Sequence, residues 1–315
     1  MEACHSPEQP NMTIYNAMVV TIVTLEVSAG MWINALIVSV ICIAWVKKKT
    51  LNSNEKILLL LGCSRFWYLC ISWIYSFLSV IYPNYLHIHP RRQTAEGVQS
   101  FLNCSNLCVT ACLCGFYCIK IAIFRNSFFI YLKVKIDELV PALLLGSVLF
   151  SLAIGILSYN ISDKLQCTNS TGSGNLWKVK FQMVEQFFPI YFFTGFGYAT
   201  VFMVAMFSAL LLLFSLWRHK RNMQTNSMKD LSMDAHIKAM KSILSFLAMY
   251  IINCTSFIVT MIYEAEGENP AMFLVYVCLF AFPGVHSLLL IFSNPKLEKT
   301  LLRVLSCVRC KVCLR

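Results

Sequence analysis

Charged residues are scarce in this chain of 315 residues: Asp, Glu, Lys and Arg make up 13 % of it, and hydrophobic residues 58 %. A soluble domain carries roughly 25 % charged residues, so this composition excludes an ordinary soluble protein. Acidic residues are the scarcer kind, 15 against 26 basic ones, which leaves a net charge of +11. The basic residues lie between long hydrophobic runs rather than in one patch, so nucleic acid is excluded as a partner.

Motifs of enzymes and metal sites are also missing. The sequence has no His-Glu-x-x-His motif, no helix with paired carboxylates and no Ser, His and Asp set that could be argued to converge. We therefore predict no catalytic residues, no metal site and no cofactor. Deep charges are few, chiefly Arg65 and Glu26, whereas a coupled transporter usually needs several ionisable groups near the midplane of the bilayer.

Seven hydrophobic stretches reach the roughly 20 residues that a helix needs to cross a bilayer. None of them alternates like a barrel strand, so the predicted fold is all-α, a polytopic membrane protein with a seven-transmembrane helix bundle. The predicted domains are an extracellular N-terminus at 1–16, the seven-transmembrane domain at 17–295 and a cytoplasmic tail at 296–315. The predicted spans are Ala17–Val46, Lys56–Tyr82, Val98–Phe124, Leu139–Leu157, Gln186–Trp217, Ala239–Tyr263 and Ala271–Phe292.

Basic residues follow the first, third, fifth and seventh spans and are rare on the other side. The positive-inside rule therefore predicts a plasma-membrane protein whose amino terminus is outside the cell and whose carboxyl terminus is in the cytosol. Three sequons for N-glycosylation fall on the predicted outer side, at Asn11, Asn160 and Asn169.

Most of the 15 cysteines lie in predicted spans, where cysteine packs as a small apolar residue. Cys4 and Cys167 lie outside, where an oxidising environment permits a disulfide between them, although nothing in the sequence fixes their separation. Cys307, Cys310 and Cys313 follow the last span among basic residues. Palmitoylation and plain reduced thiols both remain open for these three.

Arg65 lies inside the second predicted span, where an arginine costs about 2.5–3.5 kcal/mol unless it faces polar partners. It must therefore point into the bundle. Asn34, His286 and Ser287 lie at comparable depth and could supply hydrogen-bond acceptors. Two roles stay open, a structural polar cluster and an activation network whose repacking separates inactive from active states.

Five motifs, in order and in the expected spans, resemble those of the type 2 taste receptors, the bitter receptors of vertebrates and a family of G-protein-coupled receptors. The resemblance covers almost the whole chain and implies a GPCR-like bundle. The motifs are LLLLGCSR at 58–65, FYCIKIAIFRNSFFIYLK at 116–133, FSLWRH at 214–219, AHIKAMKSILSFL at 235–247 and PGVHSLLLIFSNPKLEK at 283–299.

The resemblance implies that bitter small molecules bind between the helices near Gln99, Asn103, Asn253 and Tyr276, with Gln99 standing where the family usually has tryptophan. It also implies a heterotrimeric G protein, gustducin-type or of another inhibitory class, as the partner. A seven-helix carrier or scaffold without G-protein coupling is the alternative. The candidate residues of the G-protein face are Lys120, Lys133, His219, His236 and Lys238. For the individual lysines, contact with lipid headgroups, as membrane partners, is the favoured role.

Overall fold

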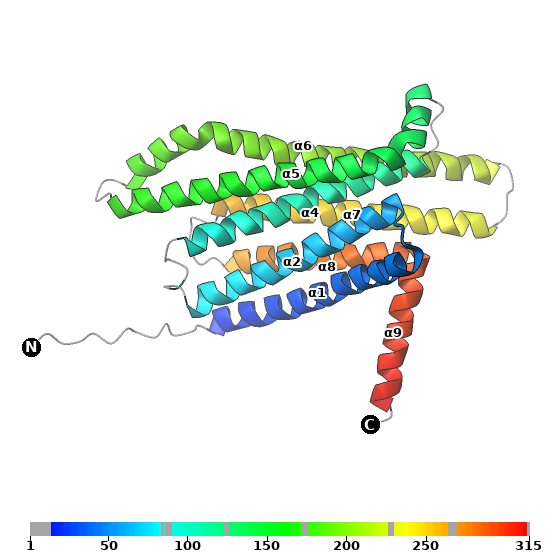
Figure 1. Ribbon diagram of the computed structural model, residues 1–315, viewed down its shortest axis with the longest axis horizontal. Helices are drawn as coiled ribbons and strands as arrows, with labels where there is room; N and C mark the ends of the chain where they lie inside the picture. The colour runs from blue at the N-terminus through cyan, green and yellow to red at the C-terminus, as the bar shows by residue number, and fades with distance from the viewer. Residues whose placement is uncertain are drawn as a thin grey trace, which may run out of the picture.

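The structure is a computed structural model that describes residues 14–82, 85, 90–122, 126–171, 176–225, 230–263 and 270–313. Long helices make up nearly all of this part of the chain (Figure 1). They are α1 (Ile14–Lys48), α2 (Ser53–Ile81), α4 (Arg91–Ile121), α5 (Ser127–Thr171), α6 (Leu176–Thr225), α7 (Asp230–Tyr263), α8 (Pro270–Ser293) and α9 (Pro295–Cys313).

Seven of these helices are long and apolar enough to cross a membrane, which confirms the all-α bundle of seven spans predicted from the sequence. The predicted boundaries were too narrow for α5, which begins at Ser127 rather than at Leu139. Its first turns contain the ion pair Lys135–Glu138, 2.9 Å between Nζ and Oε2. A prediction of membrane spans from hydrophobicity does not include these polar turns, although they are regular α-helix.

The segment expected as a tail forms α9, which leaves the bundle at an angle to the other helices (Figure 1). Leu297 and Leu301 lie one turn apart on α9 and are buried in the same apolar cluster as Ile41 of α1 and Ile57 of α2. Lys299 and Arg303 are exposed. The helix therefore has one apolar side that docks on the bundle and basic residues in contact with solvent or lipid headgroups.

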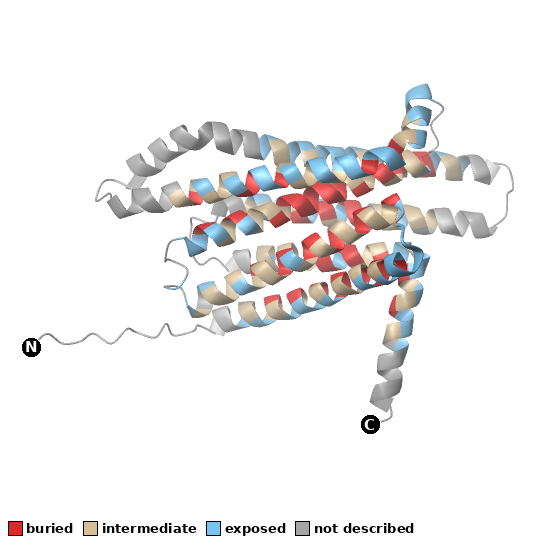
Figure 2. Ribbon diagram, viewed as in Figure 1, coloured by how far each residue is buried: buried red, intermediate tan, exposed pale blue. Residues whose placement is uncertain are grey.

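The centre of the bundle is α4, which packs against α2, α5 and α6. Buried residues follow one another along its length, as the red segments of Figure 2 show. On one side α1 packs against α2 and α8, and on the other α7 packs against α6 and α8. The helices α1, α2, α4 and α8 thus enclose one half of the interior, and α4, α6, α7 and α8 the other half.

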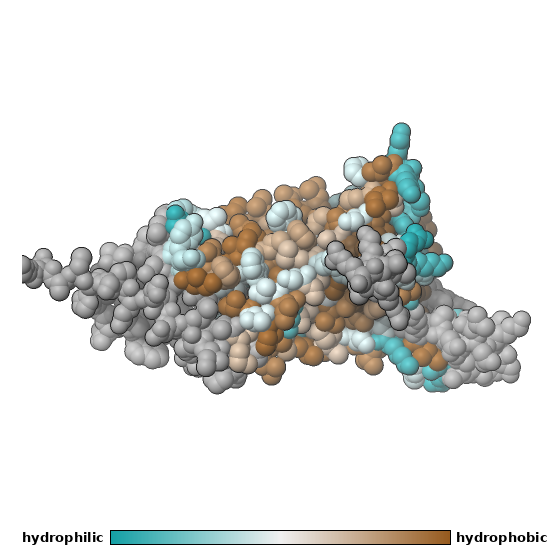
Figure 3. Space-filling view, turned by 90° about the horizontal axis from the view of Figure 1, so that it is seen from below, coloured by the Kyte–Doolittle hydropathy of each residue, from teal (hydrophilic) through white to brown (hydrophobic). Residues whose placement is uncertain are grey.

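The two ends of the bundle differ in charge. At one end, here called the basic end, the chain passes from α1 to α2, from α4 to α5, from α6 to α7 and from α8 to α9. Lys47, Lys48 and Lys120 lie at this end in the last turns of α1 and α4. Apolar side chains form a belt across the middle of the face shown in Figure 3, and most hydrophilic ones lie at the basic end.

Two pairs of glycines let helices touch backbone to backbone. Gly30 of α1 faces Gly284 of α8, where a Cβ added to Gly284 would lie 3.2 Å from the Cα of Gly30. A Cβ on Gly155 of α5 would lie 2.9 Å from the carbonyl oxygen of Gly97 of α4. Small residues at helix contacts are a common means of close packing in membranes, so these pairs fix where α1 meets α8 and where α4 meets α5.

We predict that Gly155→Ala lowers the thermal stability of the purified protein. The new methyl group would meet backbone and the Cβ of Phe101, which cannot move aside cheaply, and such overpacking costs about 1–3 kcal/mol. Gly146→Ala on the same helix is the control, because nothing lies within 4 Å of an added Cβ there. It should leave stability unchanged or raise it by up to about 1 kcal/mol. Equal shifts of the two melting temperatures, measured with a thiol-reactive dye, would contradict the packing argument.

Candidate functional site

The side chain of Arg65 is fully buried in the middle of the bundle and donates to acceptors on two other helices. Its Nε donates to Oδ1 of Asn106 at 2.9 Å, and one terminal nitrogen donates to Oγ of Ser287, also at 2.9 Å. The other terminal nitrogen contacts Oγ1 of Thr110 at 3.3 Å and Nδ1 of His286. The guanidinium thus joins α2 to α4 and to α8.

A relay extends this network to α1. Ser287 donates its hydroxyl to Oδ1 of Asn34 at 2.7 Å, and Asn34 donates Nδ2 to the carbonyl oxygen of Gly30 at 2.8 Å. His286 receives the hydrogen bond from Arg65 at Nδ1, which assigns its proton to Nε2 as a neutral ring. The structure therefore brings together all four residues predicted for the network, Asn34, Arg65, His286 and Ser287.

Neutral groups surround the guanidinium. None of the ion pairs in the described part of the chain involves Arg65. Glu26, the other deep charge, is half-buried on α1, and its Oε2 has no hydrogen-bond partner among the described residues. The positive charge is held by amide, hydroxyl and imidazole acceptors, and removing one of them would leave a charged donor unpaired in a dry interior.

Sequence reasoning missed two partners of Arg65, Asn106 and Thr110. Both are buried on α4 and are four residues apart, so they share one face of that helix. A pair of polar residues at this spacing in the middle of a span was a usable signal. This spacing does not predict, however, that the face of α4 with Asn106 and Thr110 is directed toward Arg65.

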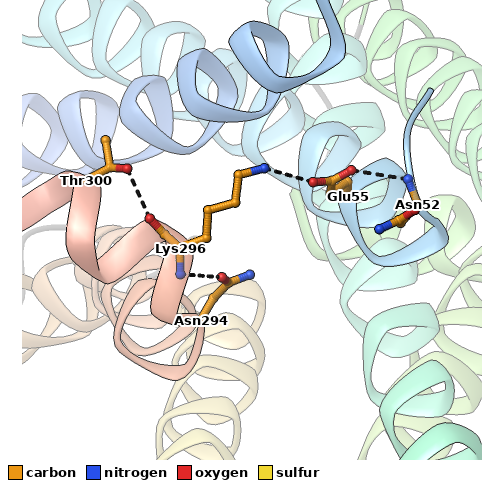
Figure 4. A network of polar contacts seen from close by, with 5 residues as sticks. All are labelled: Asn52, Glu55, Asn294, Lys296 and Thr300. Carbon is orange, nitrogen blue, oxygen red and sulfur yellow. Dashed lines mark hydrogen bonds and ion pairs between the residues drawn. The ribbon is translucent and has the colours of Figure 1, made fainter. Parts of the chain in front are cut away.

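A second polar network lies at the basic end, where α2 begins and α9 begins (Figure 4). The backbone N–H of Asn52 donates to Oε2 of Glu55 at 3.2 Å, and Lys296 Nζ donates to the other carboxylate oxygen at 3.0 Å. The backbone N–H of Lys296 donates to Oδ1 of Asn294 at 3.1 Å, so this side chain caps the first turn of α9. Glu55 therefore caps α2 and anchors α9 with a single carboxylate.

The same end of α2 is tied to α4, and α4 is tied to α5. Tyr117 donates its hydroxyl to Oδ1 of Asn54 at 3.0 Å. Lys120, predicted for the G-protein face, forms an ion pair with Asp137 of α5. Lys120 therefore connects two helices as well as lying at the basic end.

The other residues predicted for the G-protein face are only partly described. Lys133 is exposed in the first turns of α5, and His219 is half-buried near the end of α6. The side chains of His236 and Lys238 lie outside the described residues, although both positions belong to α7.

The four residues predicted to bind ligand lie on α4, α7 and α8, toward the end opposite the basic end. Gln99 donates Nε2 to Oγ of Ser72 of α2 at 3.2 Å, and Asn103 is half-buried one turn further along α4. Asn253 is buried on α7. Tyr276 packs against an apolar cluster of α1, α2, α4 and α8. Gln99 and Asn103 thus lie on α4, the helix of Asn106 and Thr110. Tyr276 lies on α8, the helix of His286 and Ser287.

Among the predicted modification sites, Asn160 is exposed on α5, which continues as a helix to Thr171. Cys4 and Asn11 lie outside the described residues. The same holds for the side chains of the remaining predicted sites, which are Cys167, Asn169, Cys307, Cys310 and Cys313.

Comparisons with known proteins agree over nearly the whole chain. The family model described as Taste receptor protein (TAS2R) matches residues 12–309. Taste receptor type 2 member 9 of Papio hamadryas is 31 % identical over 300 residues, which cover 93 % of this chain and 94 % of the relative. Taste receptor type 2 member 7 of Macaca mulatta is 31 % identical over 292 residues, 89 % of this chain and 90 % of the relative. Taste receptor type 2 member 123 of Mus musculus is 30 % identical over 313 residues, 91 % and 92 % respectively.

We predict that Asn106→Leu lowers stability more than Thr110→Val. The first change leaves Nε of Arg65 unpaired, and a hydrogen bond to a charged group is worth about 1.5–3 kcal/mol. The second removes a 3.3 Å contact from a nitrogen that keeps His286, so about 1 kcal/mol or less is expected. Thermal unfolding of both purified variants measures the difference. A Thr110→Val variant that is the less stable of the two would show that the network is not centred on the Nε contact.

Proposed function

Since the chain belongs to the taste receptor type 2 family, whose members are G-protein-coupled receptors and not enzymes, we propose that it detects bitter small molecules at the surface of the cell. The amino terminus and the end opposite the basic end face the exterior, and the basic end faces the cytosol. An agonist that binds between the helices on the outer side favours a state in which the basic ends of α6 and α7 separate. That state accepts a G protein of the gustducin type or of another inhibitory class, which leads to phospholipase and calcium signalling.

The agonist site is formed by Gln99, Asn103, Asn253 and Tyr276. Two amides on α4, a third on α7 and a phenol on α8 give a mainly apolar site a few polar groups for orientation, as small-molecule sites require. Gln99 already holds Ser72 of α2, so an agonist that takes over this hydrogen bond would also change the contact between α2 and α4.

Arg65 and its partners carry the signal from this site toward the basic end. Ser287 and His286 lie on α8, the helix of Tyr276, and are bonded to the guanidinium. The His286 ring also packs against Phe246 of α7, with 4.8 Å between ring centroids. The α8 side of the network thus contacts α7 through an aromatic pair, while Asn106 and Thr110 join α2 to α4 by hydrogen bonds.

Opening of the basic end requires α7 to leave its neighbours there. Ser242 of α7 and Ser293 of α8 share a hydrogen bond of 2.8 Å, and Ile243 packs against an apolar cluster with Leu212 and Leu216 of α6. One neutral hydrogen bond is worth only about 0.5–1.5 kcal/mol, so differential agonist binding can offset its loss. The carboxyl helix of the α subunit would then enter between the helices, near Lys133, His219, His236 and Lys238.

Modifications at the two ends complete the proposal. Outside the cell, the sequons at Asn11, Asn160 and Asn169 accept glycans, and Cys4 pairs with Cys167. In the cytosol, palmitoylation of Cys307, Cys310 or Cys313 attaches α9 to the membrane, which its exposed basic residues favour through anionic lipids.

Agonist-dependent nucleotide exchange tests the proposal. Cells that express the receptor with a chimeric α subunit are screened with a broad bitter panel, and GTPγS binding is then measured in their membranes. We expect the compounds that raise cellular calcium to raise nucleotide exchange as well. A receptor that reaches the surface and gives no exchange with any compound would favour a carrier or scaffold without G-protein coupling.

We predict that Gln99→Ala and Asn103→Ala each raise the half-maximal agonist concentration several-fold, up to about tenfold, because each removes a hydrogen bond to the agonist. Ser100→Ala is the matched control. Ser100 follows Gln99 directly, but its hydroxyl is bonded to Ser158 of α5 at 2.8 Å. With surface expression equalised, an equal loss of potency in all three variants would show that the effect comes from helix packing and not from ligand contact.

A further inference from the structure

A groove lies between α2 and α4 on the surface of the bundle, at the end opposite the basic end. Its volume is about 360 Å³. Ile71, Ile74 and Leu78 line it from α2, and Ala95 and Val98 from α4. Ile74 and Val98 are exposed, so the groove opens on the outer surface of the bundle, where a membrane protein meets lipid.

The groove follows the helix axes. Residues 71 and 78 lie seven positions apart on α2, which corresponds to about 10 Å along the helix. A partner helix, roughly 10–12 Å across, does not fit inside a groove of about 360 Å³ that runs along about 10 Å of α2. An extended hydrocarbon chain is thinner than a helix and has the right chemistry for such an apolar groove.

One positive charge marks the outer mouth of the groove. Arg91, in the first turn of α4, is exposed and stacks on the ring of Tyr85, with Cζ 3.9 Å from the ring centroid. The ring contact and a long hydrogen bond to the Tyr85 carbonyl oxygen, 3.5 Å, orient the guanidinium. None of the ion pairs in the described ranges includes Arg91.

Among the described residues, the neighbouring Arg92, unlike Arg91, takes part in an ion pair. Arg92 is paired with Glu96 of the same helix, 2.6 Å between Nε and Oε1, and it does not line the groove. Of two adjacent arginines, the one at the mouth of the groove therefore keeps its charge available for an anion.

We propose that this groove binds a phospholipid of the adjacent leaflet, with one acyl chain between α2 and α4 and the phosphate on Arg91. Charge complementarity selects this occupant, because an apolar groove with a single cation at its membrane-surface end matches a lipid whose acyl chains lead to an anionic phosphate at the membrane surface. The lipid joins the outer ends of the two helices whose inner parts are joined by Arg65, Asn106 and Thr110.

Photo-crosslinking tests the site in the full-length receptor. Purified protein is reconstituted with phosphatidylcholine that carries a diazirine in one acyl chain, or with diacylglycerol labelled in the same way. We expect phosphatidylcholine to label peptides 71–78 and 91–98, and diacylglycerol, which lacks the phosphate, to label them about fivefold less, the effect of one basic residue near a lipid phosphate.

The variants are Arg91→Gln and, as matched control, Arg92→Gln. Labelling by phosphatidylcholine should fall about fivefold in the first and stay unchanged in the second. Ala95→Phe, which fills the groove, should abolish labelling of both peptides while the protein remains monodisperse on size exclusion.

Three results would overturn the proposal. Equal labelling by the two lipids, or equal loss in the two arginine variants, would identify the contacts as ordinary surrounding lipid. With a photo-reactive amino acid in place of Ile74 or Val98 instead of the labelled lipid, crosslinks to another copy of the chain would show that a second copy covers the groove.

Discussion

The structure depends on the cost of placing the guanidinium of Arg65 in a dry interior. Its donors need acceptors in fixed directions, and the fold supplies these acceptors from α4 and α8, with α1 joined through Ser287 and Asn34. Because an unpaired charge at this depth would cost several kcal/mol, the four helices cannot shift independently of one another. The close contact of Gly30 with Gly284 lies beside the same network and adds a steric limit to the polar one.

The two halves of the interior are held by different forces. In the half formed by α1, α2, α4 and α8, directional hydrogen bonds join the helices at Arg65, and Glu55, ten positions earlier on α2, is bonded to Lys296 of α9. In the other half, Tyr250 of α7 is fully buried between Phe202 and Phe282, and its hydroxyl has no hydrogen-bond partner among the described residues. Apolar contacts have little directional preference, so α7 can slide against α6 and α8 at smaller cost than α2 can move against α4. This difference is in keeping with the proposed separation of α6 and α7 at the basic end.

Much of this arrangement could be predicted from the sequence, because hydrophobicity and length determine which segments span the membrane. The inward direction of Arg65 and three of its neighbours, Asn34, His286 and Ser287, followed from depth and polarity. Rotation of a helix about its own axis could not be predicted in the same way. Asn106 and Thr110 therefore remained unassigned, although they face Arg65. The start of α5 was predicted too late, because its first turns are polar and contain an ion pair. The helix α9 was not predicted, because it is held by a cap and by docked leucines and not by a long hydrophobic stretch.

The groove between α2 and α4 follows from the same packing constraints. Gly97 lets α4 touch α5 at Gly155, which draws the outer end of α4 toward α5, while Ala95 and Val98 are left on the side that faces α2. Arg65 holds α2 to α4 deeper in the bundle, and Gln99 is bonded to Ser72 beside the groove, so the groove is a gap on the outer surface of two helices that remain joined on their inner side. A gap of this kind cannot stay empty in a membrane without loss of van der Waals contact along its apolar walls. In a membrane, lipid acyl chains are available to fill this gap, and Arg91 at its mouth favours the binding of lipids that carry a phosphate.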